Sequence, residues 1–353
     1  MGFTVLLAFF SLIILIILHE LGHFLVAKKF GVKVEEFGIF LPPRLIGKKI
    51  GETIYSINLI PFGAFVRVLG EEGKTEDLHD IGSFSGKPIW QRVLIVVGGV
   101  VAFWLVAAVL MSFVMALGTP VAVSDEDQVS NAKVQIAQVQ ANSPAKEAGL
   151  RVGDAIRQFD KVKEVQEFTE LQKGQEVALL IERGNKVFEV SLVPRISPPE
   201  GEGAMGVALV RTAEKSYPWY QAPIKGVEVT IKMTGAIVVA LAGLLQNLIS
   251  GNGLPQGAQL MGPVGIGALL ADFAELGISQ YLYFIATIAI YLAIFNILPI
   301  PALDGGKLIF LVIEKIKGKP LNHKIEQKIT TFFFGVLLLI IILVTARDIS
   351  RLF

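Results

Sequence analysis

The stretch LLAFFSLIILIILHELGHFLVAKKFG, residues 6–31, decides the fold class of this chain. It is long enough to cross the hydrocarbon core of a bilayer, which takes about 20 apolar residues in a helix. Yet His19, Glu20 and His23 interrupt its second half. An ionisable group at the centre of a membrane helix costs roughly 2.5–3.5 kcal/mol on insertion scales, and such groups usually mark function. The stretch therefore predicts a membrane helix with a chemical role.

Composition supports a membrane protein and excludes several other classes. The 353 residues are 53% hydrophobic and 18% charged, and soluble domains are usually about 25% charged. Lys and Arg number 32 against 31 Asp and Glu, so the chain lacks the basic excess of a nucleic-acid-binding protein. Cysteine is absent, which excludes disulfides and thiolate metal sites. A transition metal would have to bind to histidine and carboxylate.

Three further segments have the length and apolarity of a membrane span, namely 89–117, 281–298 and 330–345. A fifth segment, 229–249, is apolar but carries several polar residues and ends in the glycine-rich run SGNGLPQG. We expect four transmembrane helices. We expect the fifth segment to be an amphipathic helix that lies at the outer surface or sinks partly into the membrane.

A soluble domain is predicted between the second and third spans. The stretch EVALLIERGNKVFEVSLVP, residues 176–194, alternates like two half-buried strands around an R-G-N turn. Before it, NSPAKEAGLRVGDAI predicts a short helix that begins after Ser143 and ends at Gly149, followed by a turn into a strand. The segments 28–67 and 307–328 are rich in Lys and Arg, which predicts a cytoplasmic location for both. The soluble domain and both termini would then lie outside.

His19, Glu20 and His23 form the pattern H-E-x-x-H. Positions i and i+4 share one face of a helix, so the two imidazoles can hold one Zn²⁺. Glu20 lies one residue further round, where it can act as a general base on water rather than as a ligand. A five-residue match often arises by chance in a soluble chain. Three ionisable residues at ligand spacing inside a membrane helix favour the metal site.

A catalytic zinc takes a third protein ligand, and the sequence NILPIPALDGG, residues 296–306, offers Asp304. The third span breaks there at two prolines, and irregular backbone at membrane depth is tolerated only when it is buried or lines water. Taken alone, the segment could equally be an interfacial turn with a capping Asp. Asp304 reaches the depth of His19 only if the first and third spans run parallel, so 229–249 should not cross.

Together these motifs resemble the site-2 protease family of intramembrane zinc metalloproteases, whose patterns are H-E-x-x-H and N-x-x-P-x-P-x-L-D-G. The order of segments is similar to the bacterial branch that controls extracytoplasmic sigma factors and inserts PDZ domains between the second and third spans. The resemblance implies that His19, His23 and Asp304 ligate Zn²⁺, that Glu20 is the catalytic base, and that Asn296 helps to hold the substrate backbone. The segments IPFGAFV, 60–66, and MGPVGI, 261–266, have counterparts in the same family.

The expected fold is a membrane α-helical protein of four transmembrane helices with a membrane-associated β-hairpin element and an inserted α+β PDZ domain. Its divisions are 1–30, the first span with H-E-x-x-H; 31–88, a cytoplasmic-side membrane-associated β-region; 89–118, the second span; 119–212, the extracytoplasmic PDZ domain; 213–275, an amphipathic non-spanning linker; 276–306, the third span with the Asp304 motif; 307–328, a cytoplasmic loop; and 329–353, the fourth span and C-terminus.

The β-region suggests how a membrane helix could be cut. The stretch ETIYSINLIPFGAFVRVLG alternates like two strands around Pro61–Gly63, and predicts a hairpin that dips into the bilayer. A free edge there could bind an unwound substrate by strand addition, with Phe62, Gly63 and Ala64 in contact with it. Alternatively the hairpin only plugs the active site from the cytoplasm, and the two roles are compatible.

The predicted function is zinc-dependent intramembrane cleavage of single-pass membrane proteins, such as trimmed anti-sigma factors or signal-peptide remnants, in the bacterial inner membrane. The expected partners are these substrates, the lipid bilayer and a peptide C-terminus at the PDZ domain, and no nucleic acid is expected. The stretch GEGAMGV could bind that C-terminal carboxylate or be an ordinary glycine-rich turn. The alternative function is a PDZ-containing membrane adaptor that cuts nothing. A metal transporter is disfavoured because no repeated half is visible.

Overall fold

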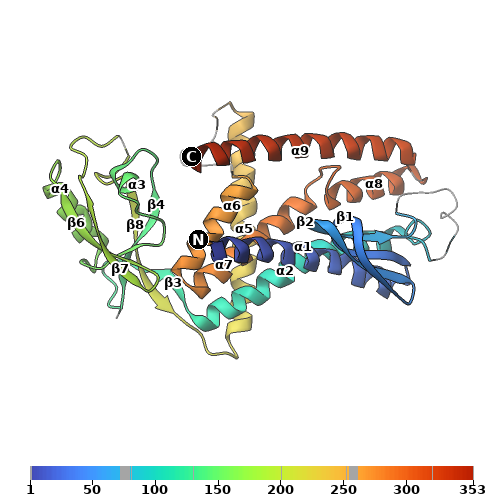
Figure 1. Cartoon of the computed structure of the whole chain (residues 1–353), viewed down its shortest axis with the longest axis horizontal. Coiled ribbons are helices and arrows are strands. Elements are labelled where there is room, and N and C mark those ends of the chain that lie inside the picture. Colours follow the sequence, from blue (N-terminus) through green and yellow to red (C-terminus); the bar gives the residue numbers. More distant parts are fainter. Residues whose placement is uncertain are drawn as a thin grey trace.

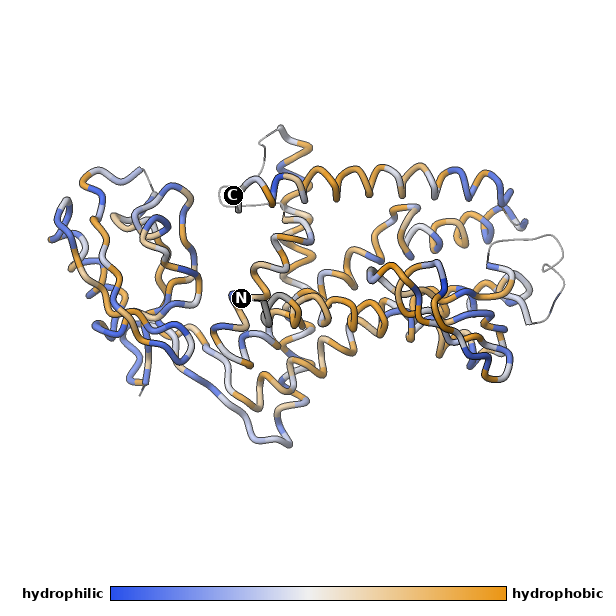
Figure 2. The backbone as a smooth tube through the Cα atoms, viewed as in Figure 1, coloured by the Kyte–Doolittle hydropathy of each residue, from blue (hydrophilic) through white to orange (hydrophobic). Residues whose placement is uncertain are grey.

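The computed structural model describes residues 2–71, 80, 82–129, 131–199, 201–251, 253, 261–319 and 321–352. In this part of the chain a bundle of long helices carries a β-rich domain at one end and a small β element at the other (Figure 1). The marked N- and C-termini lie toward the β-rich domain. Hydrophobic residues follow the long helices, and hydrophilic residues are more frequent in the β-rich domain (Figure 2).

The helices in the described residues are α1 Gly2–Lys29, α2 Ile89–Leu117, α3 Pro144–Glu147, α4 Val162–Leu171, α5 Ala222–Ile249, α6 Pro263–Leu276, α7 Ile278–Ile297, α8 Asp304–Lys317 and α9 His323–Leu352. The strands are β1 Val34–Ile50, β2 Thr53–Val68, β3 Thr119–Ala122, β4 Lys133–Val139, β5 Ala155–Ile156, β6 Val177–Arg183, β7 Lys186–Leu192 and β8 Val207–Lys215. The segment predicted as the loop 307–328 therefore contains most of α8.

The core of the helical bundle forms where α1, α2 and α7 pack together, around side chains such as Leu15, Phe103 and Ile290. Helices α1 and α2 approach very closely, because a Cβ on Gly22 would stand only 2.3 Å from the carbonyl oxygen of Gly98. Small residues permit such close contact between membrane helices. The close approach brings the face of α1 that carries the two histidines directly against α2.

Five helices in the described residues are long and apolar enough to cross a membrane, namely α1, α2, α5, α7 and α9. Helix α5 differs from the other four because it runs crosswise to them (Figure 1). It crosses α2 where Gly226 meets Ser112 and where Trp104 Nε1 donates to Thr234 Oγ1 at 3.2 Å. The crosswise course of α5 favours four spans. Because α5 is also long and apolar enough to cross a membrane, the number of four spans stays a prediction.

The β element consists of β1 and β2, which pair antiparallel. Residues 36–39 of β1 pair both with 64–67 and with 54–57 of β2, and residues 44–50 pair with 53–58. The sequence predicted a hairpin whose two arms, on either side of Pro61–Gly63, pair with each other. The pairing differs because β1 lies between those two arms. The second half of β1 and the facing part of β2 expose apolar side chains, such as Ile46 and Leu59.

The β-rich domain contains a six-stranded sheet in the order β3-β8-β4-β5-β6-β7. The predicted turn at Gly184–Asn185 joins β6 to β7, and the predicted short helix is α3. Ser143 caps α3 by accepting a hydrogen bond from the backbone N–H of Lys146. The fully buried Asp154 accepts two hydrogen bonds from Arg183, at 2.6 and 2.7 Å. Sequence patterns therefore predicted the local structure of this domain well.

Helix α6 joins the β-rich domain to α9. At its C-terminal end Asp272 forms an ion pair with Arg151 of the domain, at 2.7 Å. At its N-terminal end the backbone N–H groups of Gly262 and Gly265 both donate to Oδ2 of the buried Asp348, at 2.8 Å each. A carboxylate is stabilised at a helix N-terminus by unpaired N–H groups and the helix dipole. Helix α6 therefore has one anchor at each end.

Candidate metal centre

Helix α1 places His19 and His23 one turn apart on its buried face. Their exposed fractions are 7% and 9%, which is low for a polar residue. The His19 ring stacks on Phe103 of α2, with 4.4 Å between ring centroids. The two histidines therefore point into the protein rather than toward the surface of the bundle.

Asp304 reaches the histidines through a tight turn after α7. The helix ends at Ile297, and Asp304 begins α8. A Cβ on Gly305 would stand 2.1 Å from the carbonyl oxygen of Leu298, and one on Gly306 would stand 2.3 Å from Cα of Pro301. Only glycine fits at these two positions, so the pair Gly305–Gly306 allows the chain to fold back on itself beside the carboxylate.

The structure brings His19, His23 and Asp304 together from distant parts of the sequence. The Nε2 atoms of the two histidines lie 3.2 Å apart. Each of these nitrogens lies 3.4 Å from Oδ2 of Asp304. The three ligand atoms therefore form a nearly equilateral triangle, and the described residues contain no other group of three or more His, Cys, Asp or Glu side chains that could hold a metal ion.

The triangle fits a zinc ion. Nitrogen and oxygen ligands at about 2.0–2.1 Å from zinc in a tetrahedron would be about 3.3–3.4 Å from one another. Oδ2 of Asp304 is buried and has no hydrogen-bond partner among the described residues. Buried polar atoms are normally paired, and a cation at the centre of the triangle would satisfy this oxygen. The donor set of two imidazoles and one carboxylate is also typical of catalytic zinc, which keeps one position open.

A backbone carbonyl orients the imidazole ring of His23 within the triad. Nδ1 of His23 lies 2.9 Å from the carbonyl oxygen of Ile95 in α2. A carbonyl only accepts, so Nδ1 carries the proton and Nε2 of the neutral ring presents its lone pair toward Asp304 and His19. Such hydrogen bonds to the other ring nitrogen fix the tautomer of metal-binding histidines.

Gly99 of α2 is a part of the site that sequence reasoning missed. A Cβ at this position would stand 2.2 Å from Nε2 of His23 and 2.5 Å from Cε1 of His19. The glycine forms the wall behind both imidazoles. Its signal in the sequence is the pair Gly98–Gly99 in an otherwise bulky apolar span, which indicates close helix contact but does not say with which helix.

Glu20 and Asn296 were predicted beside the metal ligands. Glu20 follows His19 on α1 and is half-buried. Asn296 lies in the last turn of α7 and is also half-buried, and its Nδ2 donates to the carbonyl oxygen of Leu292 at 2.8 Å. One amide hydrogen of Asn296 is thus used within its own helix. Its other amide hydrogen and its oxygen remain for the predicted contact with substrate.

Phe62, Gly63 and Ala64 lie in β2. Gly63 has a φ of +80°, which favours glycine, and Ala64 is buried and pairs with Ile39 of β1. No hydrogen bond or ion pair joins Gly63 or Ala64 to the metal triad in the described part of the chain. Their contact with substrate stays a prediction.

The two remaining histidines are remote from this chemistry in the sequence. His323 begins α9, with Nδ1 at 4.0 Å from a carboxylate oxygen of Glu326. His79 lies outside the described residues.

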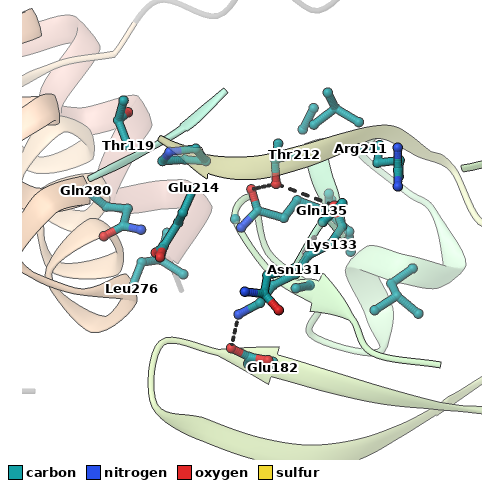
Figure 3. A pocket seen from close by; sticks show the side chains of 18 of the residues that line it. Thr119, Asn131, Lys133, Gln135, Glu182, Arg211, Thr212, Glu214, Leu276 and Gln280 are labelled. Carbon is teal, nitrogen blue, oxygen red and sulfur yellow. Dashed lines mark hydrogen bonds and ion pairs between the residues drawn. The ribbon is translucent and has the colours of Figure 1, made fainter. Parts of the chain in front are cut away.

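A large cavity lies elsewhere, between the β-rich domain and the adjoining ends of α2, α6 and α7. Its volume is about 1930 Å³, and none of the four residues His19, Glu20, His23 and Asp304 lines it. Leu276 and Gln280 of the helices and Glu214 of β8 are among the residues that line it (Figure 3). Most of the cavity wall belongs to the β-rich domain, including Lys133 and Glu182, which form an ion pair at 2.6 Å. The cavity and the metal triad are therefore separate features.

Comparison with known proteins assigns the chain to a family. The model of the family described as "Peptidase family M50" matches residues 7–341. A Clostridium perfringens protein named "Putative zinc metalloprotease CPE1693" is 34% identical over 342 residues, which cover 95% of each chain. The Bacillus subtilis "Regulator of sigma-W protease RasP" is 28% identical, with 96% of each chain covered. The "Zinc metalloprotease RasP" of Oceanobacillus iheyensis is also 28% identical, with 96% of this chain and 97% of the relative covered.

The family match extends over nearly the whole chain and includes both motifs that supply the triad. It decides between the two functions inferred from the sequence, because a peptidase family is not a family of adaptors. The several apolar helices make the protein a multi-pass membrane protein. The chain therefore belongs to peptidase family M50 and is a metalloprotease whose cofactor is Zn²⁺.

Proposed function

We propose that this zinc metalloprotease is an intramembrane endopeptidase that cleaves single-pass membrane proteins within or next to their membrane segments. The observation that carries this proposal is the convergence of His19, His23 and Asp304 at distances of 3.2–3.4 Å. The two histidines belong to a helix with the length and composition of a membrane span. A substrate that is itself a membrane helix can reach a site at that depth by moving sideways through the bilayer.

His19, His23 and Asp304 would hold the zinc ion, since their three ligand atoms are buried and mutually close. When bound there, zinc supplies a Lewis acid that polarises the scissile carbonyl and makes water a stronger acid. Glu20 would take the proton of the attacking water on a carboxylate oxygen and pass it to the nitrogen of the departing strand.

The β element would hold the substrate in an extended form. Backbone groups of an unwound helix need hydrogen-bond partners inside a membrane, and a strand edge can supply them by strand addition. We place this contact in β2 around Phe62, Gly63 and Ala64. The second amide hydrogen of Asn296 would donate to the same substrate backbone. Support comes from the exposed apolar residues Ile46 and Leu59, which suit an element lying in the membrane. The same element can close the site when no substrate is present.

The β-rich domain, 119–212, would be an extracytoplasmic PDZ module. Among the described residues, strand β3 pairs with residues 212–215 of β8, and no strand lies along the same edge of β8 at residues 207–211. The loop before β8, in which Gly206 has a φ of +74°, would present backbone N–H groups to a C-terminal carboxylate at the end of that edge. This arrangement suits the binding of an extended peptide tail.

The topology that fits these roles has α1, α2, α7 and α9 as four spans, with α5 and α6 in a non-spanning linker. The basic segment 307–328 would be cytoplasmic, as would the β element, and the protein would lie in a bacterial inner membrane. The name of the Bacillus subtilis relative includes regulation of sigma-W. Anti-sigma factors trimmed by another protease are therefore one substrate class to test, and signal-peptide remnants are another.

The deciding experiment is co-expression of the chain with a panel of tagged single-pass proteins, followed by mass spectrometry of the fragments. Wild type should release fragments cut within or beside the membrane segment. Glu20→Gln should slow cleavage by about 10²–10⁴-fold, the usual size of a general-base contribution, and retain bound zinc. Glu35→Gln, at an exposed position in β1, is the matched control and should cleave normally. Cleavage by Glu20→Gln at the wild-type rate would refute the assignment.

A further inference from the structure

The β element and the segment directly after it contact both helices that carry the metal triad, and each contact lies close to a residue of the triad. On α1 the contact is made by Phe24, the residue directly after His23. Its ring packs edge-on against Phe37 of β1, with centroids 5.4 Å apart, and against Tyr55 of β2, with centroids 6.0 Å apart.

On α8 the contact is an ion pair. Lys307 lies one helical turn after Asp304, and its Nζ pairs with Oε1 of Glu71. Glu71 follows β2 by three residues. Both side chains are partly buried, with exposed fractions of 44% for Lys307 and 23% for Glu71. Water screens such a pair less than a fully exposed one.

The segment before Glu71 is held by two hydrogen bonds, one to the residue that precedes β1 and one to the segment that precedes α2. The backbone N–H of Leu69 donates to the carbonyl oxygen of Lys33 at 2.9 Å. Ser85 Oγ donates to the carbonyl oxygen of Gly70 at 2.5 Å. Because these bonds fix the segment on both sides, a force at Glu71 reaches β2 rather than being absorbed by a loose chain.

From these contacts we infer that Lys307 is a positioning residue of the protease. With Glu71 it holds the end of β2 at a fixed distance from Asp304, so that the strand edge that receives the substrate stays aligned with the triad. The expected effect of Lys307 on cleavage rests on the proposed function. The attachment itself rests only on the ion pair and on the contacts of Phe24.

A second role for Lys307 would give different results. Its positive charge also acts on Asp304 and on Glu20, so removal of the charge could impair the chemistry directly. A double-mutant cycle separates the two roles. If Lys307 acts through Glu71, the variant Lys307→Met adds little harm once Glu71→Met has been made. If Lys307 acts on the triad, its loss is equally harmful in both backgrounds.

The test uses the full chain in lipid nanodiscs and compares wild type with Lys307→Met, Glu71→Met and the double variant. The control is Lys315→Met, because Lys315 is exposed on the same helix. Hydrogen exchange at the backbone amides of residues 66–71 and bound zinc are measured without turnover, and KM and kcat are measured with a cleaved reporter. In each single variant, the exchange rate and KM should rise by about three- to tenfold, the effect expected when a partly buried ion pair is lost. The amount of bound zinc and kcat should stay at their wild-type values.

The double variant should be no worse than the more affected single variant, and Lys307→Arg should restore both exchange and KM. Unchanged exchange in both single variants would overturn the inference. So would a fall in kcat for Lys307→Met that Glu71→Met does not share, because that result assigns Lys307 to the chemistry. The exchange measurement tests the attachment of β2 to α8 even if no reporter is cleaved. A failure of this inference can therefore be told apart from a failure of the proposed function.

Discussion

Gly99 of α2 lies directly against His23 of α1, so that a methyl group on its Cα would stand 2.2 Å from Nε2 of the imidazole. Both histidines pack on this one position. The triad itself comes from α1 and from the first residue of α8, but the wall behind it belongs to α2.

Substitution Gly99→Ala should therefore disrupt the metal centre without unfolding the bundle. The added methyl group must push His19 or His23 out of the triangle, and a displacement of about 1 Å can cost on the order of 10²-fold in activity. Bound zinc, measured by mass spectrometry of the purified protein, should fall together with activity. Gly235→Ala is the control, because a Cβ there meets nothing within 4 Å. Normal zinc content in Gly99→Ala would contradict this account of the site.

Removal of the metal should abolish cleavage reversibly. A strong chelator should inactivate the protein, and added Zn²⁺ should restore it, since the triad carries the ligands but cannot supply the Lewis acid. Asp304→Asn keeps the shape of the side chain but replaces the charged oxygen with a weaker neutral ligand. Its zinc content should be well below equimolar. Asp272→Asn, at the far end of α6, should bind zinc normally, and equal zinc in both variants would remove Asp304 from the site.

Replacement of Asp348 should loosen α9. Its carboxylate accepts hydrogen bonds from two N–H groups at the start of α6, and loss of such a cap costs about 0.5–2 kcal/mol. Hydrogen exchange in the last turns of α9 should rise in Asp348→Ala and less in Asp348→Asn, whose amide oxygen still accepts. Arg347→Gln, at the neighbouring exposed position, should leave exchange unchanged. Equal exchange in the Ala variant and wild type would show that α9 is held by other contacts.

The β element should depend on pH through Glu36. Burial alone would raise the pKa of Glu36, but hydrogen bonds from Arg44 and Ser56 and the charges of Arg44 and Arg67 outweigh it and hold this pKa below its usual value. A carboxyl with a lowered folded pKa stabilises the fold above its unfolded pKa of about 4.3. That contribution is lost as the pH falls through the folded value.

Glu36→Gln should therefore have a lower melting temperature than wild type at pH 7, and the difference should shrink as the pH falls below about 4. Thermal melts of the two proteins across this range test the prediction. A difference that stays constant from neutral pH to pH 3 would assign the stabilisation to packing rather than to charge.

The sequence predicted the three residues of the triad, because ionisable side chains are unusual inside an apolar membrane span. Ionisable residues in an apolar span are conspicuous, and the prolines around Asp304 mark a break in another span, so His19, His23 and Asp304 could be paired before any coordinates were known. The back wall could not be predicted in the same way. Gly99 has no chemistry of its own, and its role depends on which helix packs against it.

The β element was predicted only in part, because strand periodicity is local and pairing is not. The alternation around Pro61–Gly63 correctly marked strand-like residues. It could not show that residues 34–39 separate the two arms, since that pairing brings together distant stretches of chain. The ion pair between Glu71 and Lys307 likewise joins residues far apart in the sequence.

Helix α6 has 14 residues, which makes it a rod about 21 Å long. Because a short helix resists bending, a tilt of the β-rich domain at the Arg151 end cannot be absorbed along its length. The far end must either carry α9 with it or break the hydrogen bonds to Asp348. A displacement of the β-rich domain would therefore be transmitted mechanically through α6 to α9.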